Sequence, residues 1–282
     1  MLNNLLDHAL SIAKEIGSNI IVVISKKEME ISDDDVQIVF APRSYATMLE
    51  SLFFSIEEEL GDEFIGRSLI ERATAFIQTK DYISTFLYFK GFELIGKAVG
   101  VVDLDALKGI IVVELEKSKI QKALSECAER VHPKVLRAVL NVAMSIAQKG
   151  REGRRIGTAF VIGDVEEVLK RSRQLILNPY ECHPPHERDI TNPSTWESVR
   201  EFAQLDGVFV VDETGIIVAA GRYLDVSGKD LKVRKGLGGR HLACAAITRE
   251  TEAIAVVVSE SGGDIKVYKD GEEILAIDVG IL

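Results

Sequence analysis

The sequence predicts an α/β fold in two parts, and two observations support this prediction. Over residues 1–120, short apolar runs bounded by polar turns alternate with longer segments of helical periodicity, a pattern typical of an α/β domain with a largely parallel sheet. Residues 121–282 begin with helical segments and continue with paired strand patterns, which predicts a mixed β-sheet flanked by helices. We therefore expect two domains, residues 1–120 and residues 121–282.

The first domain is expected to contain a helix, two strands, two helices and two further strands. Its opening segment has apolar residues at helical spacing with Asp7 among them, which favours an amphipathic helix over a signal peptide. We find no phosphate-binding glycine motif and no cluster of catalytic residue types here, so oligomerisation and regulation both remain open as its role. The expected elements are residues 2–16, 19–24, 36–41, 45–57, 68–78, 98–104 and 109–115.

The second domain is expected to open with a helix near Ser118 and to contain two β-hairpins. One hairpin turns at Asp-Glu-Thr-Gly with Gly215 in the left-handed region, and the other turns at Asp270-Gly271. Asp164 is the expected N-cap of a helix over residues 165–173, and Ser194 is the expected N-cap of a helix that ends near Ala203. The remaining expected elements are helices 134–148 and 240–251, strands 156–162 and 253–259, hairpins 205–221 and 264–277, and the proline-rich loop 177–196.

Composition restricts the classes of function. The hydrophobic content of 46% allows a full core, and the net charge of −10 argues against a general nucleic-acid-binding surface. The three cysteines are far apart in the sequence, which suits reduced thiols better than a disulfide framework. No apolar run reaches the length of a membrane span. We expect a soluble, cytoplasmic protein with no membrane and no nucleic-acid partner.

Positive charge is concentrated in the stretch KDLKVRKGLGGRHLACAA. Glycines at 236, 238 and 239 allow close approach to the backbone, and the helix that follows has unpaired N–H groups at its start. Together these features predict an anion site, most plausibly for a polyphosphate. An exposed basic loop that leads into an ordinary helix is the alternative interpretation. The basic residues of the stretch are Lys229, Lys232, Arg234, Lys235 and Arg240.

Two acidic positions lie near apolar strands. Asp206 precedes a strand beside Gly207, where a carboxylate can hold a divalent cation close to a phosphate. Ser259 and Glu260 follow another apolar strand and add a hydroxyl and a second carboxylate. Each of these pairs, taken alone, is more often a turn or the end of a strand.

The order of these motifs resembles the diadenylate cyclase (DAC) domain family. The family has an Asp-Gly-Ala motif, a Gly-Thr-Arg-His-Arg motif and a Ser-Glu pair, and LDGV, GGRHL and SE occur here in the same order. The resemblance covers residues 134–282 and extends to REGRRIGTAFVIGD, LNP and RDITNP. A soluble α/β domain ahead of the cyclase domain is similar to the archaeal, DacZ-like branch, whose first domain resembles the C-terminal domain of pyruvate kinase.

This resemblance implies the condensation of two ATP molecules into cyclic di-AMP with release of two pyrophosphates. Asp206 would be a metal ligand near the attacking hydroxyl, with Arg240 and His241 as further catalytic residues that bind phosphates. Glu260 would bind or support the metal, Mn²⁺ or Mg²⁺, and two such domains would face each other in a homo-oligomer. The nucleotide-binding residues would be Leu205, Gly207, Gly238, Gly239, Ser259 and Glu260, with Leu205 against the adenine.

Departures from the family motifs leave an alternative open. Val208, Gly239 and Leu242 stand where the family has Ala, Thr and Arg, so a protein that binds ATP or cyclic di-AMP without making it is the alternative function. A different alternative is a structural zinc site in the proline-rich loop, formed by Cys182, His183 and His186. Oligomer size and regulation do not follow from the sequence.

Overall fold

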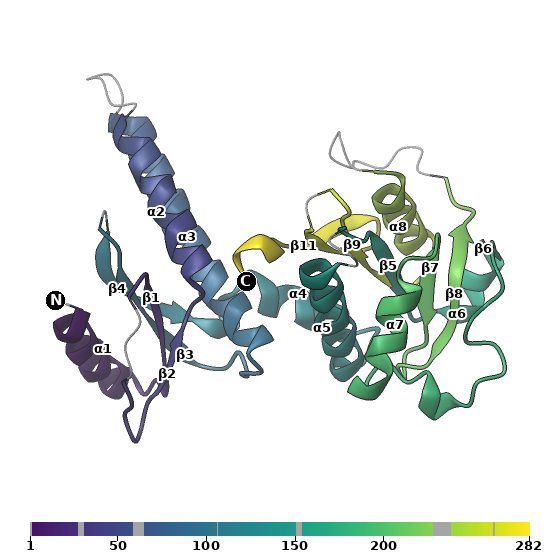
Figure 1. Cartoon of the computed structure of the whole chain (residues 1–282), viewed down its shortest axis with the longest axis horizontal. Coiled ribbons are helices and arrows are strands. Elements are labelled where there is room, and N and C mark those ends of the chain that lie inside the picture. The colour runs from purple at the N-terminus through teal and green to yellow at the C-terminus, as the bar shows by residue number, and fades with distance from the viewer. Residues whose placement is uncertain are drawn as a thin grey trace. The chain divides into compact units, whose positions relative to one another are not determined.

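The computed structural model describes residues 2–27, 31–58, 65–105, 107–150, 154–227, 238–261 and 263–282 (Figure 1). The chain divides into two compact units, one formed by residues 1–122 with 281–282 and the other by residues 123–280. Each unit has its own β-sheet, of four and seven strands. The described helices include none with both the length and the apolar composition that a membrane crossing requires.

The first unit contains a sheet with the strand order β2-β1-β3-β4. The first three of these strands are parallel, and β4 runs antiparallel to β3. The sheet is therefore mixed, although its predicted parallel part is present. Its strands are β1 (Ile20–Ser25), β2 (Gln37–Phe40), β3 (Lys97–Asp103) and β4 (Lys108–Glu114), and its helices are α1 (Leu2–Ile16), α2 (Arg43–Glu58) and α3 (Ile65–Phe89).

Alternation along the strands explains how both faces of this sheet are covered. Leu6 and Ala9 of α1 pack against Ile21 and Val99, which point to one face. On the other face Gly100 lies against Ile83 of α3, whose Cδ1 atom would be only 2.6 Å from a Cβ at this glycine. Figure 1 shows α1 on one side of the sheet and the α2–α3 hairpin on the other. Burial on both faces accounts for the continuous apolar character of the strands.

The second unit contains a sheet with the strand order β11-β10-β9-β5-β7-β8-β6. Only β5 and β7 are parallel neighbours, so the predicted mixed sheet is confirmed. Its strands are β5 (Thr158–Ile162), β6 (Ser172–Gln174), β7 (Val208–Val211), β8 (Ile217–Leu224), β9 (Ile254–Val258), β10 (Ile265–Lys269) and β11 (Glu272–Ile277). Helix α4 (Lys119–Cys127) leads into it, followed by α5 (Pro133–Lys149), α6 (Val165–Lys170), α7 (Trp196–Phe202) and α8 (Gly239–Glu250).

Helices cover both faces of the central strands in this unit (Figure 1). Cys244 and Ile247 of α8 belong to one buried cluster with Ala159 of β5. On the opposite face, Phe160 stacks on Phe209 with ring centroids 4.9 Å apart. The sheet is therefore sandwiched between helices, and α8 is held with its first turn near the start of β7 and the end of β8.

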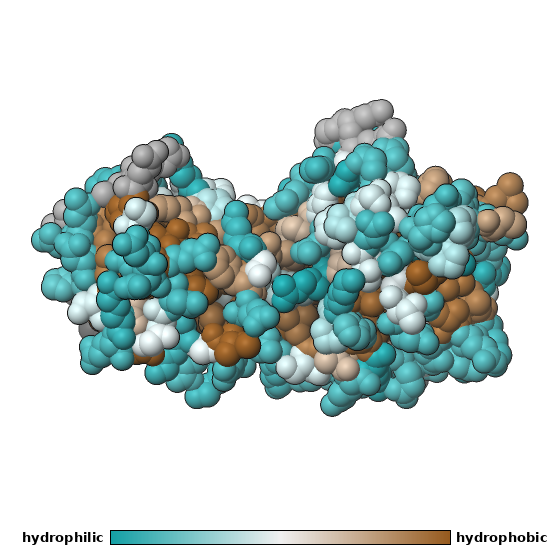
Figure 2. Space-filling view, turned by 90° about the horizontal axis from the view of Figure 1, so that it is seen from below, coloured by the Kyte–Doolittle hydropathy of each residue, from teal (hydrophilic) through white to brown (hydrophobic). Residues whose placement is uncertain are grey.

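Hydrophilic residues cover most of the face seen in Figure 2, and hydrophobic residues gather there in smaller patches.

One of the two predicted helix caps is confirmed in position, and the other is wrong. Asp164 is the N-cap residue of α6 and has a positive φ of 45°, but it makes no side-chain cap bond; its carboxylate accepts a hydrogen bond from the backbone N–H of Glu252. Helix α6 ends at Lys170, and strand β6 occupies residues that were expected to be helical. Ser194 is not a cap: Asn192 accepts a hydrogen bond from its backbone N–H at the start of the short 3₁₀ helix Pro193–Thr195.

Candidate active site

A hollow of about 600 Å³ opens in the second unit between three segments that are distant in sequence. They are the start of β7, the end of β8 with the neighbouring β6, and the first turn of α8. Asp206 and Arg240, both predicted from the sequence as site residues, line the same hollow. The complete lining is Arg173, Leu175, Asp206, Gly207, Val208, Arg222, Tyr223, Leu224, Gly239, Arg240 and Ala243.

The backbone at Gly207 brings Asp206 to the rim of the hollow. Gly207 has a φ of +110°, which side chains other than glycine rarely adopt, and a Cβ here would lie 2.5–2.6 Å from backbone atoms of Gly221 and Arg222. The chain therefore approaches β8 closely at this point. Asp206 is exposed, and no hydrogen bond or ion pair with another described residue engages its carboxylate. An exposed carboxylate without a partner is available to a ligand.

Arg240, Glu260 and Gly157 meet beside the first turn of α8. A Cβ on Gly157 would lie 2.5 Å from Nη1 of Arg240, 2.9 Å from Cβ of Glu260 and 3.1 Å from the backbone nitrogen of Glu260. The absence of a side chain at Gly157 thus makes room for the guanidinium. Arg240 is half-buried and has no ion pair within the part of the chain that the structure describes. Its charge adds to the partial positive charge of the helix N-terminus.

The wall of the hollow combines cations with apolar surface. Arg173 forms an ion pair of 2.6 Å with Asp225, and its guanidinium carbon lies 4.7 Å from the ring centroid of Tyr223. Arg222, which also lines the hollow, donates from Nε to Ser172 Oγ at 2.9 Å, and this bond orients its guanidinium. A ligand that enters would meet positive charge together with aromatic and aliphatic side chains.

His241 lies apart from the hollow although it follows Arg240 directly. Its side chain is buried, and its Nδ1 lies 3.1 Å from the hydroxyl of Tyr268. Burial, with Lys266 as a smaller cause, lowers the pKa of His241 to about 4. The ring is therefore neutral near pH 7. A role for it in binding phosphate remains a prediction.

The other predicted residues are distributed around the site. Gly239 lines the hollow, and Gly238 is the N-cap of α8 without a side-chain cap bond. Leu205 is half-buried but does not line the hollow, and Ser259 has its hydroxyl 3.3 Å from that of Ser261. The basic residues Lys229, Lys232, Arg234 and Lys235 and the neighbouring Gly236 lie outside the described residues.

The proline-rich loop does not assemble the alternative zinc site. Cys182 is exposed, and Nδ1 of His183 pairs with Glu187 at 2.9 Å. Within the residues that the structure describes, no group of three or more His, Cys, Asp or Glu side chains is arranged to hold a metal ion. A three-ligand site formed by Cys182, His183 and His186 is therefore not present in this loop.

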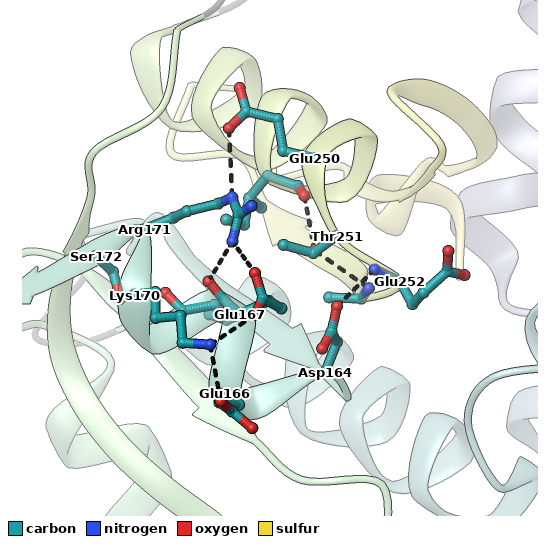
Figure 3. A network of polar contacts seen from close by, with 12 residues as sticks. Asp164, Glu166, Glu167, Lys170, Arg171, Ser172, Glu250, Thr251 and Glu252 are labelled. Carbon is teal, nitrogen blue, oxygen red and sulfur yellow. Dashed lines mark hydrogen bonds and ion pairs between the residues drawn. The ribbon is translucent and has the colours of Figure 1, made fainter.

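A polar network outside the hollow attaches the far end of α8 to α6 (Figure 3). Nη1 of Arg171 contacts Glu167 of α6, and its Nε lies 3.7 Å from Glu250 at the end of α8. Asp164 accepts a hydrogen bond of 2.9 Å from the backbone N–H of Glu252. Such partly exposed ion pairs contribute little free energy of folding. Their effect is to orient α8, whose first turn carries Arg240.

Sequence reasoning missed several residues that line or support the hollow. Arg173, Leu175, Arg222 and Tyr223 come from β6, the residue after it and β8, which become neighbours only through the strand order of the sheet. Gly157 is the second residue of the Ile-Gly-Thr run that enters β5, and a glycine directly before a buried strand was the one local signal for a close approach.

Comparison with known families supports this division of the chain. Residues 145–273 match the model of a family described as DisA bacterial checkpoint controller nucleotide-binding. Every site residue predicted from the sequence falls in this range. Residues 4–116 match a second family, described as the probable sensor domain DacZ_A. A likeness of the first unit to the C-terminal domain of pyruvate kinase stays a prediction.

Two curated relatives carry the name diadenylate cyclase. The chain is 38% identical to one from Methanocaldococcus jannaschii over 175 residues, which are 62% of this chain and 55% of the relative. It is 40% identical to one from Haloferax volcanii over 176 residues, which are 62% of this chain and 64% of the relative. The matches thus span less than two thirds of the relatives' own length. The crystal structure of a double mutant of DacA from Staphylococcus aureus matches 50% of this chain and 84% of its own chain, at 24% sequence identity and a TM-score of 0.35.

Proposed function

We propose, from the family match of residues 145–273 and the similarity to two diadenylate cyclases, that the chain condenses two ATP molecules into cyclic di-AMP. Two pyrophosphates would be released. The observation that carries the proposal is the convergence of Asp206, Arg240 and the start of α8 on one hollow of about 600 Å³. A volume of this size is in the range that binds small-molecule ligands.

The charge distribution of the hollow supports a triphosphate as its ligand. Arg240 is a half-buried guanidinium without an ion pair among the described residues, and it lies at a helix start where N–H groups are unpaired. Phosphate oxygens can accept two hydrogen bonds at once from a guanidinium. We assign the triphosphate to this end of the hollow, with Gly238 and Gly239 close to it.

The apolar wall supports the opposite end as the place for adenine. Leu175 and Tyr223 line the hollow and are 44% and 49% exposed, so both present apolar surface to a ligand. Val208 and Ala243 complete this wall. We therefore assign the base to this wall, next to which Leu205 is a supporting residue.

Asp206 is proposed to assist the attack of the 3′-hydroxyl. Its carboxylate is free to accept the hydroxyl proton or to help hold a divalent ion, Mn²⁺ or Mg²⁺, that arrives with the triphosphate. The side chains alone would not complete the coordination of such an ion, because the described ranges contain no group of three or more His, Cys, Asp or Glu side chains placed to hold one. Asp206 and Glu260 would supply carboxylate oxygens, and the phosphates the remaining ones. When bound, the ion neutralises charge on the reacting phosphates.

The symmetry of the product supports a pair of facing sites. Each ATP must supply one hydroxyl and one α-phosphate, and two identical hollows related by a two-fold axis meet this need. Several large apolar side chains are exposed on or near the rim, which supports contact with a second copy. They are Leu175, Ile176, Leu177, Tyr223 and Leu242. The family description of residues 4–116 favours regulation as the role of the first unit.

The alternative function is binding of ATP or cyclic di-AMP without turnover. Leu242 is 37% exposed where the family motif has an arginine, so one positive charge of the motif is missing here. Arg222 supplies a positive charge to the same hollow from β8, which favours the enzyme, whereas Arg173 is paired with Asp225.

Incubation with ATP and Mn²⁺, followed by chromatography and mass spectrometry, tests the proposal. We expect a cyclic dinucleotide from the unaltered chain and none from Asp206→Asn, a variant of the same size. Binding of ATP in a calorimetric titration without any product would establish the alternative.

A further inference from the structure

A second hollow, of about 430 Å³, lies in the C-terminal unit and shares no lining residue with the candidate active site. Its walls come from the end of α5, the segment that leads into β5, the loop after β9 and the turn after β11. Neither the motif comparison nor the proposed reaction assigns anything to it.

Among the residues that the structure describes, three cations and no carboxylate line this hollow. They are Lys149, Arg154 and Arg155, and none of them forms an ion pair with a described residue. Asp264 and Asp278 are close enough to influence the local charge: burial and repulsion by Asp278 raise the pKa of Asp264, whereas Lys266 and Arg155 oppose this. Three cations that form no ion pair with a described residue, gathered around one concavity, are unusual in a chain with a net charge of −10.

The backbone of the hollow leaves recognition to these side chains. The N–H groups of the three lining glycines are engaged: Gly150 donates to the carbonyl of Ile146, Gly263 to that of Ser259 and Gly280 to the carboxylate of Asp278, each at 2.9 Å. A ligand would therefore be held by charged side-chain donors and not by a nest of free amides.

We propose that this hollow binds the polyphosphate group of a small molecule through Lys149, Arg154 and Arg155. Three cations match the two to four negative charges of a di- or triphosphate, and two guanidinium groups suit its oxygens geometrically. The overall negative charge of the chain argues against a nucleic acid as the occupant. The volume is adequate for a pyrophosphate group with part of a larger molecule.

The proposed site is connected to the candidate active site by one hydrogen bond. Nη1 of Arg155 donates to the backbone carbonyl of Ser261 at 3.2 Å, and Ser261 follows Glu260. A phosphate that draws Arg155 toward itself competes with this bond and so acts on the loop that carries Glu260. This consequence rests on the proposed function, whereas binding of the anion does not.

Calorimetric titration with inorganic pyrophosphate tests the proposal. Because the candidate active site would also attract pyrophosphate, the titrations use the full chain with Arg240→Gln as background. Lys149→Gln is compared with Lys134→Gln, the same substitution at the other end of α5, where Lys134 is exposed. Loss of one charged hydrogen bond should weaken binding about tenfold in Lys149→Gln alone.

Two results would overturn the proposal: no binding of pyrophosphate to the Arg240→Gln chain, or equal affinity in the Lys149→Gln and Lys134→Gln chains. Lys149 and Lys134 are exposed and Arg240 is half-buried, so loss of folding is not expected, and a thermal melt verifies this for each variant. Failure of the chain to make cyclic di-AMP would leave the titration and its interpretation unchanged.

Discussion

Replacing Gly157 by alanine is expected to disable the candidate active site without removing any of its polar side chains. The added Cβ would lie 2.5 Å from Nη1 of Arg240, whereas ordinary contact begins at 3.4 Å, so the guanidinium must move by about 0.9 Å (3.4 − 2.5). The Cβ of Glu260, at 2.9 Å, must move by about 0.5 Å (3.4 − 2.9). A misplacement of about 1 Å in a positioning group typically costs on the order of 100-fold in rate.

The same substitution is expected to lower the free energy of unfolding by about 1–3 kcal/mol, as overpacking of a filled site does. The rate is measured as kcat/KM for formation of cyclic di-AMP, the affinity for ATP by titration, and the free energy of unfolding by denaturant. Gly109→Ala is the matched control, because a Cβ at Gly109 has no atom within 4 Å. Wild-type kcat/KM and ATP affinity in Gly157→Ala would refute the placement of Arg240 in the site.

Three further predictions concern single side chains. Asp206→Asn should reduce turnover by at least about 100-fold. The melting temperature should stay unchanged, because the carboxylate is exposed and without a partner among the described residues. Near-normal product formation by this variant would contradict the role assigned to Asp206. Arg240→Gln should weaken ATP binding about tenfold and lower kcat/KM with it; an unchanged calorimetric affinity would place the phosphates elsewhere. Burial lowers the pKa of His241 from 6.5 to about 4. Between pH 6.5 and pH 4, therefore, His241 binds a proton in the unfolded chain but not in the folded chain. The free energy of unfolding should therefore fall as the pH decreases from 6.5 toward 4, by at most about 1.4 kcal/mol per pH unit from this residue. His241→Gln should remove that part of the slope, and an identical slope in denaturant titrations at pH 5 to 6.5 would contradict the neutral, buried ring.

Local patterns were sufficient for most of the secondary structure. The hairpin formed by β7 and β8 follows from two β-branched runs around a turn, and Gly215 has the positive φ, +100°, that the turn requires. Helix α5 begins at Pro133 behind the exposed His132, whose Nδ1 accepts a hydrogen bond from the N–H of Lys134. Distant residues decided the details: Asp164 is the predicted N-cap of α6, but its carboxylate binds the N–H of Glu252, 88 positions away, and makes no cap bond.

Only those residues of the candidate site that belong to a sequence motif were predictable. Asp206, Gly239 and Arg240 belong to motifs in the sequence and meet in the hollow, as expected from their order. Arg173 and Tyr223 were missed because β6 and β8 become neighbours through the sheet. The buried position of His241 was also not predictable, since it depends on the hydroxyl of Tyr268 on a strand that follows α8.

The most direct test of the central claim is the stoichiometry of the products formed from ATP. Cyclic di-AMP and pyrophosphate are quantified in the same reaction mixture of the full chain with Mn²⁺, and Asp206→Asn gives the background. Two pyrophosphates for each cyclic dinucleotide, with both products absent from the variant, is the result that a diadenylate cyclase predicts. Release of pyrophosphate or phosphate without the dinucleotide, or the same products from both chains, would contradict it.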